Sequence, residues 1–167
     1  ENKNLELSHF NLTSNEVGFS QWIFDKHIIY IGGGNTAYML EIWKNYNLIN
    51  IFKNAYKKGI ILSGVSAGGV CWFDWILTDS LGSGYKPLKG INLISGSCTP
   101  HSLEDNRVSQ YQSEIKKNKL PPGVAIDDGV AVLFVNGVAK EVCSTRENCD
   151  AYFVDKNNKI SLKEYIK

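Results

Sequence analysis

Residues 60–69 read Ile-Ile-Leu-Ser-Gly-Val-Ser-Ala-Gly-Gly, and this stretch indicates how the chain is built. The apolar run 60–62 predicts a buried strand, and the small residues around Ser66 permit a sharp turn into a helix. A side chain on such a turn has a strained backbone, so small neighbours are needed to let the flanking chain pass close to it. The pattern therefore predicts a strand, a turn and a helix, with the Ser66 hydroxyl held above the carboxyl end of a sheet as in a nucleophile elbow.

Strand-like and helix-like patterns alternate along the rest of the chain. Residues 28–31 read Ile-Ile-Tyr-Ile and predict a buried parallel strand, after which Asn35 or Thr36 can cap a helix. The alternation predicts an α/β fold, a three-layer sandwich with a mainly parallel central sheet, in a single domain over residues 1–167. Further helices are expected to end at Lys57-Lys58-Gly59 and to begin at a capping box on Ser102, and further strands are expected at residues 5–7, 91–94, 124–126, 130–135, 151–154 and 160–162.

The composition excludes several classes of function. Eighteen basic and 17 acidic residues give a net charge of +1, which offers no electrostatic reason to bind nucleic acid or an anionic membrane. The apolar runs have the length of strands, and we expect neither a membrane-spanning helix nor a signal peptide. The four cysteines lack a CxxC pair, which argues against a zinc site and favours reduced thiols in the cytoplasm, although Cys143 and Cys149 flank a short loop and could bridge in an exported chain.

A serine nucleophile requires a general base, and His101 is the histidine best placed to supply it. It follows Pro100 on a loop after an expected strand, and loops at strand ends carry catalytic groups. His27 immediately precedes a buried strand, which suits a surface or strand-edge position, and His9 lies in a weakly patterned segment. We therefore expect His101 to be the base.

The third catalytic group should be a carboxylate that orients the imidazole. Asp79 is our first choice because it lies between the helix after Ser66 and the His101 loop. Asp127 and Asp128 are the competitors, at a strand end where aspartate often only makes a turn. Asp74 is expected to be a solvated charge on the helix that follows Ser66.

The three consecutive glycines Gly32, Gly33 and Gly34 form the second motif that indicates a functional site. Between a strand and a capped helix they leave backbone N–H groups free to approach an anion. The Walker ending and the GxGxxG spacing are both missing, so an oxyanion hole fits better than a phosphate loop, and a purely structural turn is the alternative.

Taken together, these motifs resemble the dipeptidase E and cyanophycinase family of serine peptidases over about residues 28–138. The quoted elements are Gly32-Gly33-Gly34-Asn35-Thr36, Gly64-Val65-Ser66-Ala67-Gly68, Pro100-His101 and Ala125-Ile126-Asp127-Asp128-Gly129, in that order. The resemblance implies a flavodoxin-like fold related to class I glutamine amidotransferases. It also implies Ser66 as nucleophile, His101 as base, Asp79 as the acidic member, and the backbone of Gly33, Gly34 and Ala67 as oxyanion donors.

The chain departs from the family pattern at two places. Family members begin with a further strand and helix ahead of Leu5, so we expect an N-terminally truncated domain, and the only methionine, Met39, agrees with a missing start. Family members also hold a substrate aspartate with a basic residue shortly after the histidine, where Arg107 is the nearby candidate here. We expect Asn35 and Arg107 to bind substrate, without carrying over aspartyl specificity.

The expected function is hydrolysis of small peptides by a serine peptidase through an acyl-enzyme on Ser66. An esterase or amidase with the same triad, and an inactive binding or regulatory homologue, are the alternatives. No metal or organic cofactor is required. The expected partner is a small peptide substrate, with no nucleic acid and no membrane, and a truncated sheet should make the chain aggregate or form a homodimer.

Overall fold

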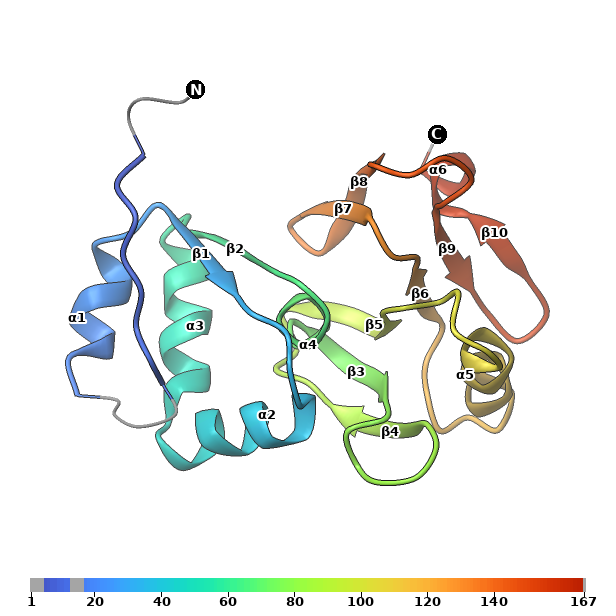
Figure 1. The fold of residues 1–167 in the computed structure, drawn as a ribbon, viewed down its shortest axis with the longest axis horizontal. Helices are drawn as coiled ribbons and strands as arrows, with labels where there is room; N and C mark the ends of the chain where they lie inside the picture. Colours follow the sequence, from blue (N-terminus) through green and yellow to red (C-terminus); the bar gives the residue numbers. More distant parts are fainter. Residues whose placement is uncertain (1–4, 13–16, 167) are drawn as a thin grey trace.

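The computed structural model describes residues 5–12 and 17–166. The chain forms two parts, which Figure 1 shows next to each other. One part holds the first three helices and two strands, and the other holds the remaining strands with α5 and α6, while α4 lies between them. The helices are α1 (Phe19–Phe24), α2 (Thr36–Asn45), α3 (Leu48–Lys57), α4 (Ala67–Val70), α5 (Arg107–Lys116) and α6 (Leu162–Tyr165). The strands are β1 (Ile28–Ile31), β2 (Ile61–Gly64), β3 (Phe73–Thr78), β4 (Lys86–Lys89), β5 (Ile94–Thr99), β6 (Gly123–Ile126), β7 (Val130–Val135), β8 (Val138–Ser144), β9 (Ala151–Val154) and β10 (Lys159–Ser161).

The first part is built on a parallel pair of strands. β1 pairs with β2, with Ile28 opposite Ile61, and α3 packs against one face through the buried Phe52. The opposite face carries Ile28, Tyr30 and Ile61, each more than half exposed. The prediction of a strand at 28–31 is confirmed, but burial on both faces is wrong. The strand predicted at residues 5–7 is also wrong, because that segment has no strand pairing.

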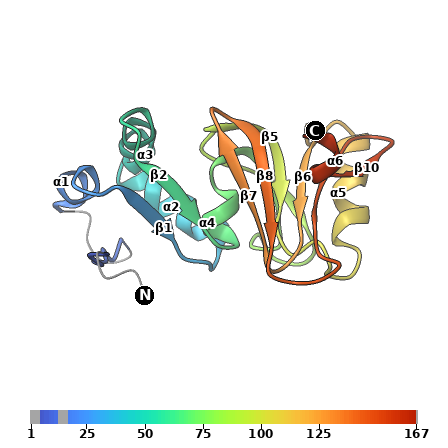
Figure 2. The ribbon, with the colours of Figure 1, turned by 90° about the horizontal axis from the view of Figure 1, so that it is seen from above.

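The second part is a layered structure around a six-stranded sheet of order β10-β9-β6-β5-β3-β4. Figure 2 shows the β7–β8 hairpin on one side of this sheet and α5 on the other. Phe134 of the hairpin meets Phe73 of the sheet edge to face, with ring centroids 5.3 Å apart. On the opposite face, Tyr111 and Ile115 of α5 are fully buried against the sheet.

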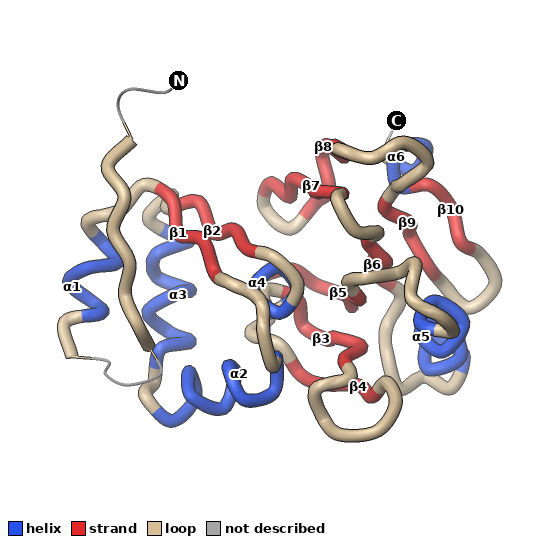
Figure 3. The backbone as a smooth tube through the Cα atoms, in the orientation of Figure 1, coloured by secondary structure: helices blue, strands red, loops and turns tan. Residues whose placement is uncertain are grey.

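The α/β class is confirmed, but the expected single, mainly parallel central sheet is not. Helices and strands alternate only in the first half of the chain, and the second half is dominated by strands (Figure 3). Among the described strands, the pairs β1–β2, β3–β5 and β5–β6 are parallel, and the other four pairs are antiparallel. The longest helices of the described part have ten residues, too short to cross a bilayer.

Local sequence signals explain several boundaries. Asn35 caps α2 by accepting a hydrogen bond from the Tyr38 N–H at 2.9 Å, as predicted. Asn136 and Gly137 both have positive φ, at 52° and 77°, and close the predicted β7–β8 hairpin. The strands predicted at 124–126, 130–135, 151–154 and 160–162 correspond to β6, β7, β9 and β10 within one or two residues.

Tertiary contacts explain why two of the predicted helix features are wrong. The helix after Ser66 ends at Val70, and Asp74 lies on β3 because β4 and β5 pair with that strand on both sides. The capping box at Ser102 does not form, because the Ser102 hydroxyl donates to Asp127 and its N–H donates to the Ile126 carbonyl. These bonds hold Ser102 outside the helix, which begins only at residue 107. The strand predicted at 91–94 lies instead at 94–99.

Candidate active site

Ser66 lies on a tight turn between β2, which ends at Gly64, and α4, which begins at Ala67. Its backbone angles, φ 53° and ψ −119°, are sparsely populated for a residue with a side chain. The turn requires glycine on both sides. A Cβ on Gly64 would lie 2.4 Å from the Gly68 carbonyl oxygen, and a Cβ on Gly68 would lie 2.2 Å from the Ile31 carbonyl oxygen. The turn therefore requires small residues around Ser66 for steric reasons, as predicted.

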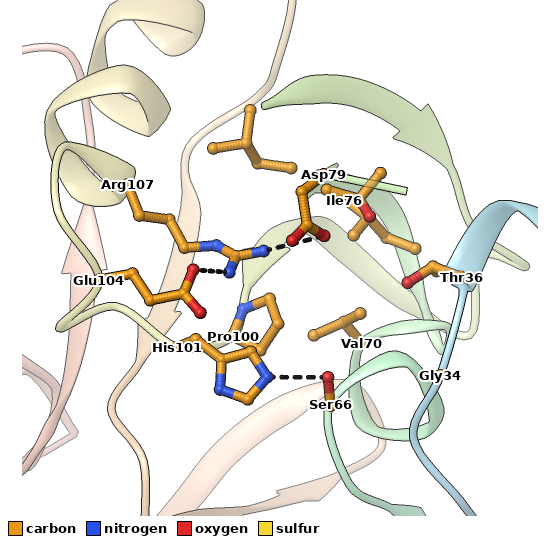
Figure 4. A pocket seen from close by; sticks show the side chains of 12 residues that line it. Gly34, Thr36, Ser66, Val70, Ile76, Asp79, Pro100, His101, Glu104 and Arg107 are labelled. Carbon is orange, nitrogen blue, oxygen red and sulfur yellow. Dashed lines mark hydrogen bonds and ion pairs between the residues drawn. The ribbon is translucent and has the colours of Figure 1, made fainter. Parts of the chain in front are cut away.

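His101 meets the Ser66 hydroxyl from the loop that follows β5. The Ser66 Oγ lies 2.9 Å from His101 Nε2, and this contact is drawn in Figure 4. On the other side of the ring, Nδ1 lies 2.5 Å from Asp128 Oδ1. With the proton on Nδ1, the imidazole donates to Asp128 and leaves Nε2 to accept the Ser66 proton. The three side chains form a continuous hydrogen-bonded series.

The carboxylate beside His101 is Asp128, and the prediction of Asp79 in that position is wrong. β5 has β3 and β6 as its two parallel neighbours, so Asp79, His101 and Asp128 all follow strands that end at the same edge. Asp79 turns away from the imidazole, and its Oδ1 lies 3.7 Å from Nη2 of Arg107. The Asp79 side chain is 65% exposed. The sequence offered both carboxylates as candidates without showing which one faces the ring.

Asp127 stabilises the loop that carries His101. Its side chain is buried, accepts a hydrogen bond from the Ser102 hydroxyl, and accepts another from the Asp150 N–H at 2.9 Å. Ser102 is the residue directly after His101, so this contact ties the histidine loop to the end of β6. Asp127 therefore has a structural position one residue away from the carboxylate that touches the imidazole.

A cavity of about 170 Å³ opens beside Ser66 and His101. Figure 4 shows Arg107, Glu104 and Asp79 along the part of this pocket away from Ser66, with Thr36 and Val70 on another wall. The remaining lining residues are Gly34, Ile76, Leu77, Thr78 and Pro100.

Arg107 is almost completely buried, with 2% of its side chain exposed, and two of its nitrogen atoms donate hydrogen bonds within the protein. Nη1 donates to Glu104 Oε2 at 2.5 Å, and Nε donates to the Thr99 hydroxyl at 3.1 Å. The guanidinium also lies 4.7 Å from the centre of the Tyr85 ring. Tyr85 donates its hydroxyl to Glu104 at 3.1 Å, and desolvation together with this hydrogen bond raises the pKa of Tyr85. Neither Glu104 nor Tyr85 was predicted from the sequence as a site residue.

The glycine loop after β1 lies against the serine turn. A Cβ on Gly33 would lie 3.4 Å from the Ser66 Cβ, so the backbone there approaches the hydroxyl-bearing residue closely. Gly34 lines the cavity, and Ala67 opens α4, where a first-turn N–H has no intrahelical acceptor. Asn35 is not among the lining residues. Its side chain caps α2 and donates to the Ser80 carbonyl at 3.4 Å, so the predicted contact of Asn35 with substrate has no support in this geometry.

Comparison with known proteins identifies the class to which this fold and site belong. The model of Peptidase family S51 matches residues 2–142, so the chain belongs to this family of peptidases, the dipeptidase E family. A protein of Bacillus subtilis (strain 168) described as "Uncharacterized peptidase YgaJ" is 37% identical over 149 residues. The match covers 89% of this chain and 64% of the relative, so the chain spans less than two thirds of that relative's length. The resemblance inferred from the sequence motifs is confirmed.

Proposed function

We propose that the protein is a serine peptidase that hydrolyses small peptides through an acyl-enzyme on Ser66. The observation that carries the proposal is the series from Ser66 Oγ through His101 to Asp128, with separations of 2.9 and 2.5 Å. Nucleophile, base and orienting carboxylate in hydrogen-bond reach of one another are the signature of this chemistry. Membership of a peptidase family supports a peptide bond as the bond cleaved.

In the proposed reaction, Ser66 Oγ attacks the peptide carbonyl carbon while His101 Nε2 takes the hydroxyl proton. Asp128 holds the Nδ1–H and stabilises the imidazolium that forms. The N–H groups of Gly33, Gly34 and Ala67 are the proposed donors to the tetrahedral oxyanion. His101 then gives its proton to the leaving amine, and the C–N bond breaks. Water hydrolyses the Ser66 ester with His101 again acting as base.

Turnover of defined substrates tests this proposal. The rate enhancement over the uncatalysed reaction should be larger for members of a dipeptide panel than for matched aryl esters, because the chain belongs to a peptidase family. The Ser66→Ala variant should lose activity by a factor on the order of a million, as triad deletions in serine hydrolases can. Ser83→Ala, in an exposed loop, is the matched control and should keep the wild-type rate.

Two results would refute the proposal. If the Ser66→Ala variant retains a tenth of the wild-type rate while folding normally, Ser66 is not the nucleophile. If the wild-type protein cleaves aryl esters but no peptide, the same three residues serve an esterase or amidase.

A further inference from the structure

We propose that Asp127 is a positioning residue for the reaction, which acts through Ser102 to hold His101 between Ser66 and Asp128. This inference rests on the proposed function and adds to it a residue that does not line the pocket. A carboxylate with only a structural role would affect stability alone. A positioning residue also has to affect kcat, because the direction of the His101 ring depends on it.

His101 has a backbone conformation that the surrounding structure must hold. Its φ is 52°, in the left-handed region. Among the described residues other than glycine, eight have positive φ, and all of them are asparagine except Ser66 and His101. Such a conformation persists only where neighbouring contacts fix it. The direction of the imidazole ring therefore depends on the contacts of the residues beside His101.

The contacts that fix the histidine loop come from the end of β6. Ser102, the residue after His101, donates its N–H to the Ile126 carbonyl at 3.0 Å and its hydroxyl to Asp127 Oδ1. Asp128, whose carboxylate meets the imidazole, directly follows Asp127. The base and its orienting carboxylate are thus joined a second time, by a side-chain hydrogen bond between the residues next to them.

Asp127 is itself held by the start of β9. Its N–H donates to the Asp150 carbonyl at 3.1 Å, and its Oδ2 accepts from the Asp150 N–H at 2.9 Å. β6 pairs with β5, which leads to His101, and on its other side with β9 (Figure 1). Asp127 therefore connects the histidine loop to three neighbouring strands of the sheet.

The burial of Asp127 indicates a role beyond stability. Its exposed fraction is 3%, and within the described part of the chain no cationic side chain pairs with it. A buried carboxylate without a cation opposes folding unless its hydrogen bonds compensate, and two apolar side chains would close the same contact without that penalty. A directional contact beside the catalytic histidine accounts for a carboxylate at this position.

Kinetics of Asp127→Asn test the inference with a dipeptide that the wild type cleaves. The amide keeps the size of the side chain but turns an NH2 group toward one of the two donors, Ser102 or Asp150. We expect kcat to fall about tenfold to a hundredfold, because a misplacement of about 1 Å can cost a factor of about 100. KM should stay within about threefold, because the pocket lining is unchanged.

Glu114→Gln is the matched control. Glu114 is another buried carboxylate, on α5 and outside the pocket lining. Its replacement should lower the stability measured by urea unfolding while kcat stays at the wild-type value. This comparison separates the loss of a buried carboxylate from the loss of the contact with Ser102.

Ser102 variants test the same hydrogen bond without a change of charge, and they serve even if Asp127→Asn does not fold. Ser102→Ala should lower kcat by a factor similar to that of Asp127→Asn, and Ser102→Thr, which keeps the hydroxyl, should restore most of the rate. In the double variant Asp127→Asn with Ser102→Ala, kcat should fall no further than in either single variant, because both changes break one bond.

Nitrogen NMR of the His101 ring keeps this inference separate from the proposed reaction. Two-bond ¹H–¹⁵N spectra of the neutral imidazole show which nitrogen carries the proton, and they need no turnover. The wild type should hold the proton on Nδ1, facing Asp128, and Asp127→Asn and Ser102→Ala should each show a mixture of the two tautomers. If no peptide is hydrolysed but this change is found, the proposed function fails and the positioning role stands.

Three results would overturn the positioning role. The first is a kcat within about threefold of the wild-type value in the folded single variants. The second is a double variant in which the two losses multiply. The third is a tautomer of His101 that is the same in the wild type and in both variants.

Discussion

Replacing Asp128 with asparagine should reduce turnover strongly, and the structure allows the size of the effect to be worked out. Asp128 Oδ1 lies 2.5 Å from His101 Nδ1, and these atoms bear opposite charges once the imidazole has accepted the Ser66 proton. At that separation two unit charges attract by about 1.7 kcal/mol in bulk water and about 7 kcal/mol at the effective dielectric constant of about 20 typical of a protein surface.

Solvent access places the Asp128 effect between these limits. The side chains of His101 and Asp128 are 33% and 39% exposed, so water screens part of the attraction. A loss of about 3 to 5 kcal/mol of transition-state stabilisation corresponds to a decrease in kcat of about 10²- to 10⁴-fold. The asparagine amide would also favour the wrong imidazole tautomer, which acts in the same direction.

The assay measures kcat with one uncharged dipeptide for Asp128→Asn and Asp79→Asn side by side. Asp79 does not touch the imidazole, so its replacement should cost less than about tenfold with this substrate. The reasoning is refuted if Asp128→Asn keeps more than a tenth of the wild-type kcat, or if Asp79→Asn shows the larger loss. Far-UV circular dichroism and thermal unfolding establish that both variants are folded.

Three further predictions concern stability and association. Gly68→Ala should destabilise the fold by about 1 to 3 kcal/mol in urea unfolding, because the new Cβ would lie 2.2 Å from the Ile31 carbonyl oxygen. Gly32→Ala is the control and should cost less than half as much, because a Cβ on Gly32 would have no atom within 4 Å. The hydrogen bond from Lys117, together with the other lysine contacts, outweighs desolvation and lowers the pKa of Glu114. The ionised Glu114 therefore stabilises the fold above its unfolded-state pKa, and this stabilisation is lost as the pH falls through the lower folded-state pKa. Wild type should therefore lose more stability than Glu114→Gln between pH 7 and pH 3.5 in urea unfolding, and equal losses would contradict this. We propose that the exposed face of β1 and β2, which carries Ile28, Tyr30 and Ile61, mediates self-association. Tyr30→Lys should therefore lower the sedimentation coefficient at high protein concentration. A wild-type protein that is monomeric at every concentration would contradict the proposal.

The sequence was most informative where a local steric rule determines the structure. Gly64 and Gly68 must lack side chains for the turn at Ser66 to form, so the turn could be predicted from the pattern alone. The Asn136-Gly137 turn is another example, since both residues adopt the positive φ that the hairpin needs. In these places the residues that determine the structure are adjacent in the chain.

The sequence was least informative where pairing between distant segments decides. The stretch after Val70 has apolar residues that suit a helix or a strand. It forms the strand β3 because it pairs with β4 on one side and β5 on the other. Likewise Asp79 and Asp128 both follow strands next to β5, and the choice between them depends on side-chain directions. Arg107 pairs with Glu104 only three residues before it, and this pairing was not predicted because the sequence does not show which way either side chain points.

Covalent labelling of Ser66 tests the central claim most directly. The folded protein is treated with a fluorophosphonate and the modified residue is identified by peptide mass spectrometry. The account predicts one label on Ser66, none on that peptide in Ser66→Ala, and much slower labelling in His101→Ala, because the hydroxyl is activated through the 2.9 Å contact with the imidazole. Absence of labelling, a label on another serine, or an unchanged rate in His101→Ala would contradict the account.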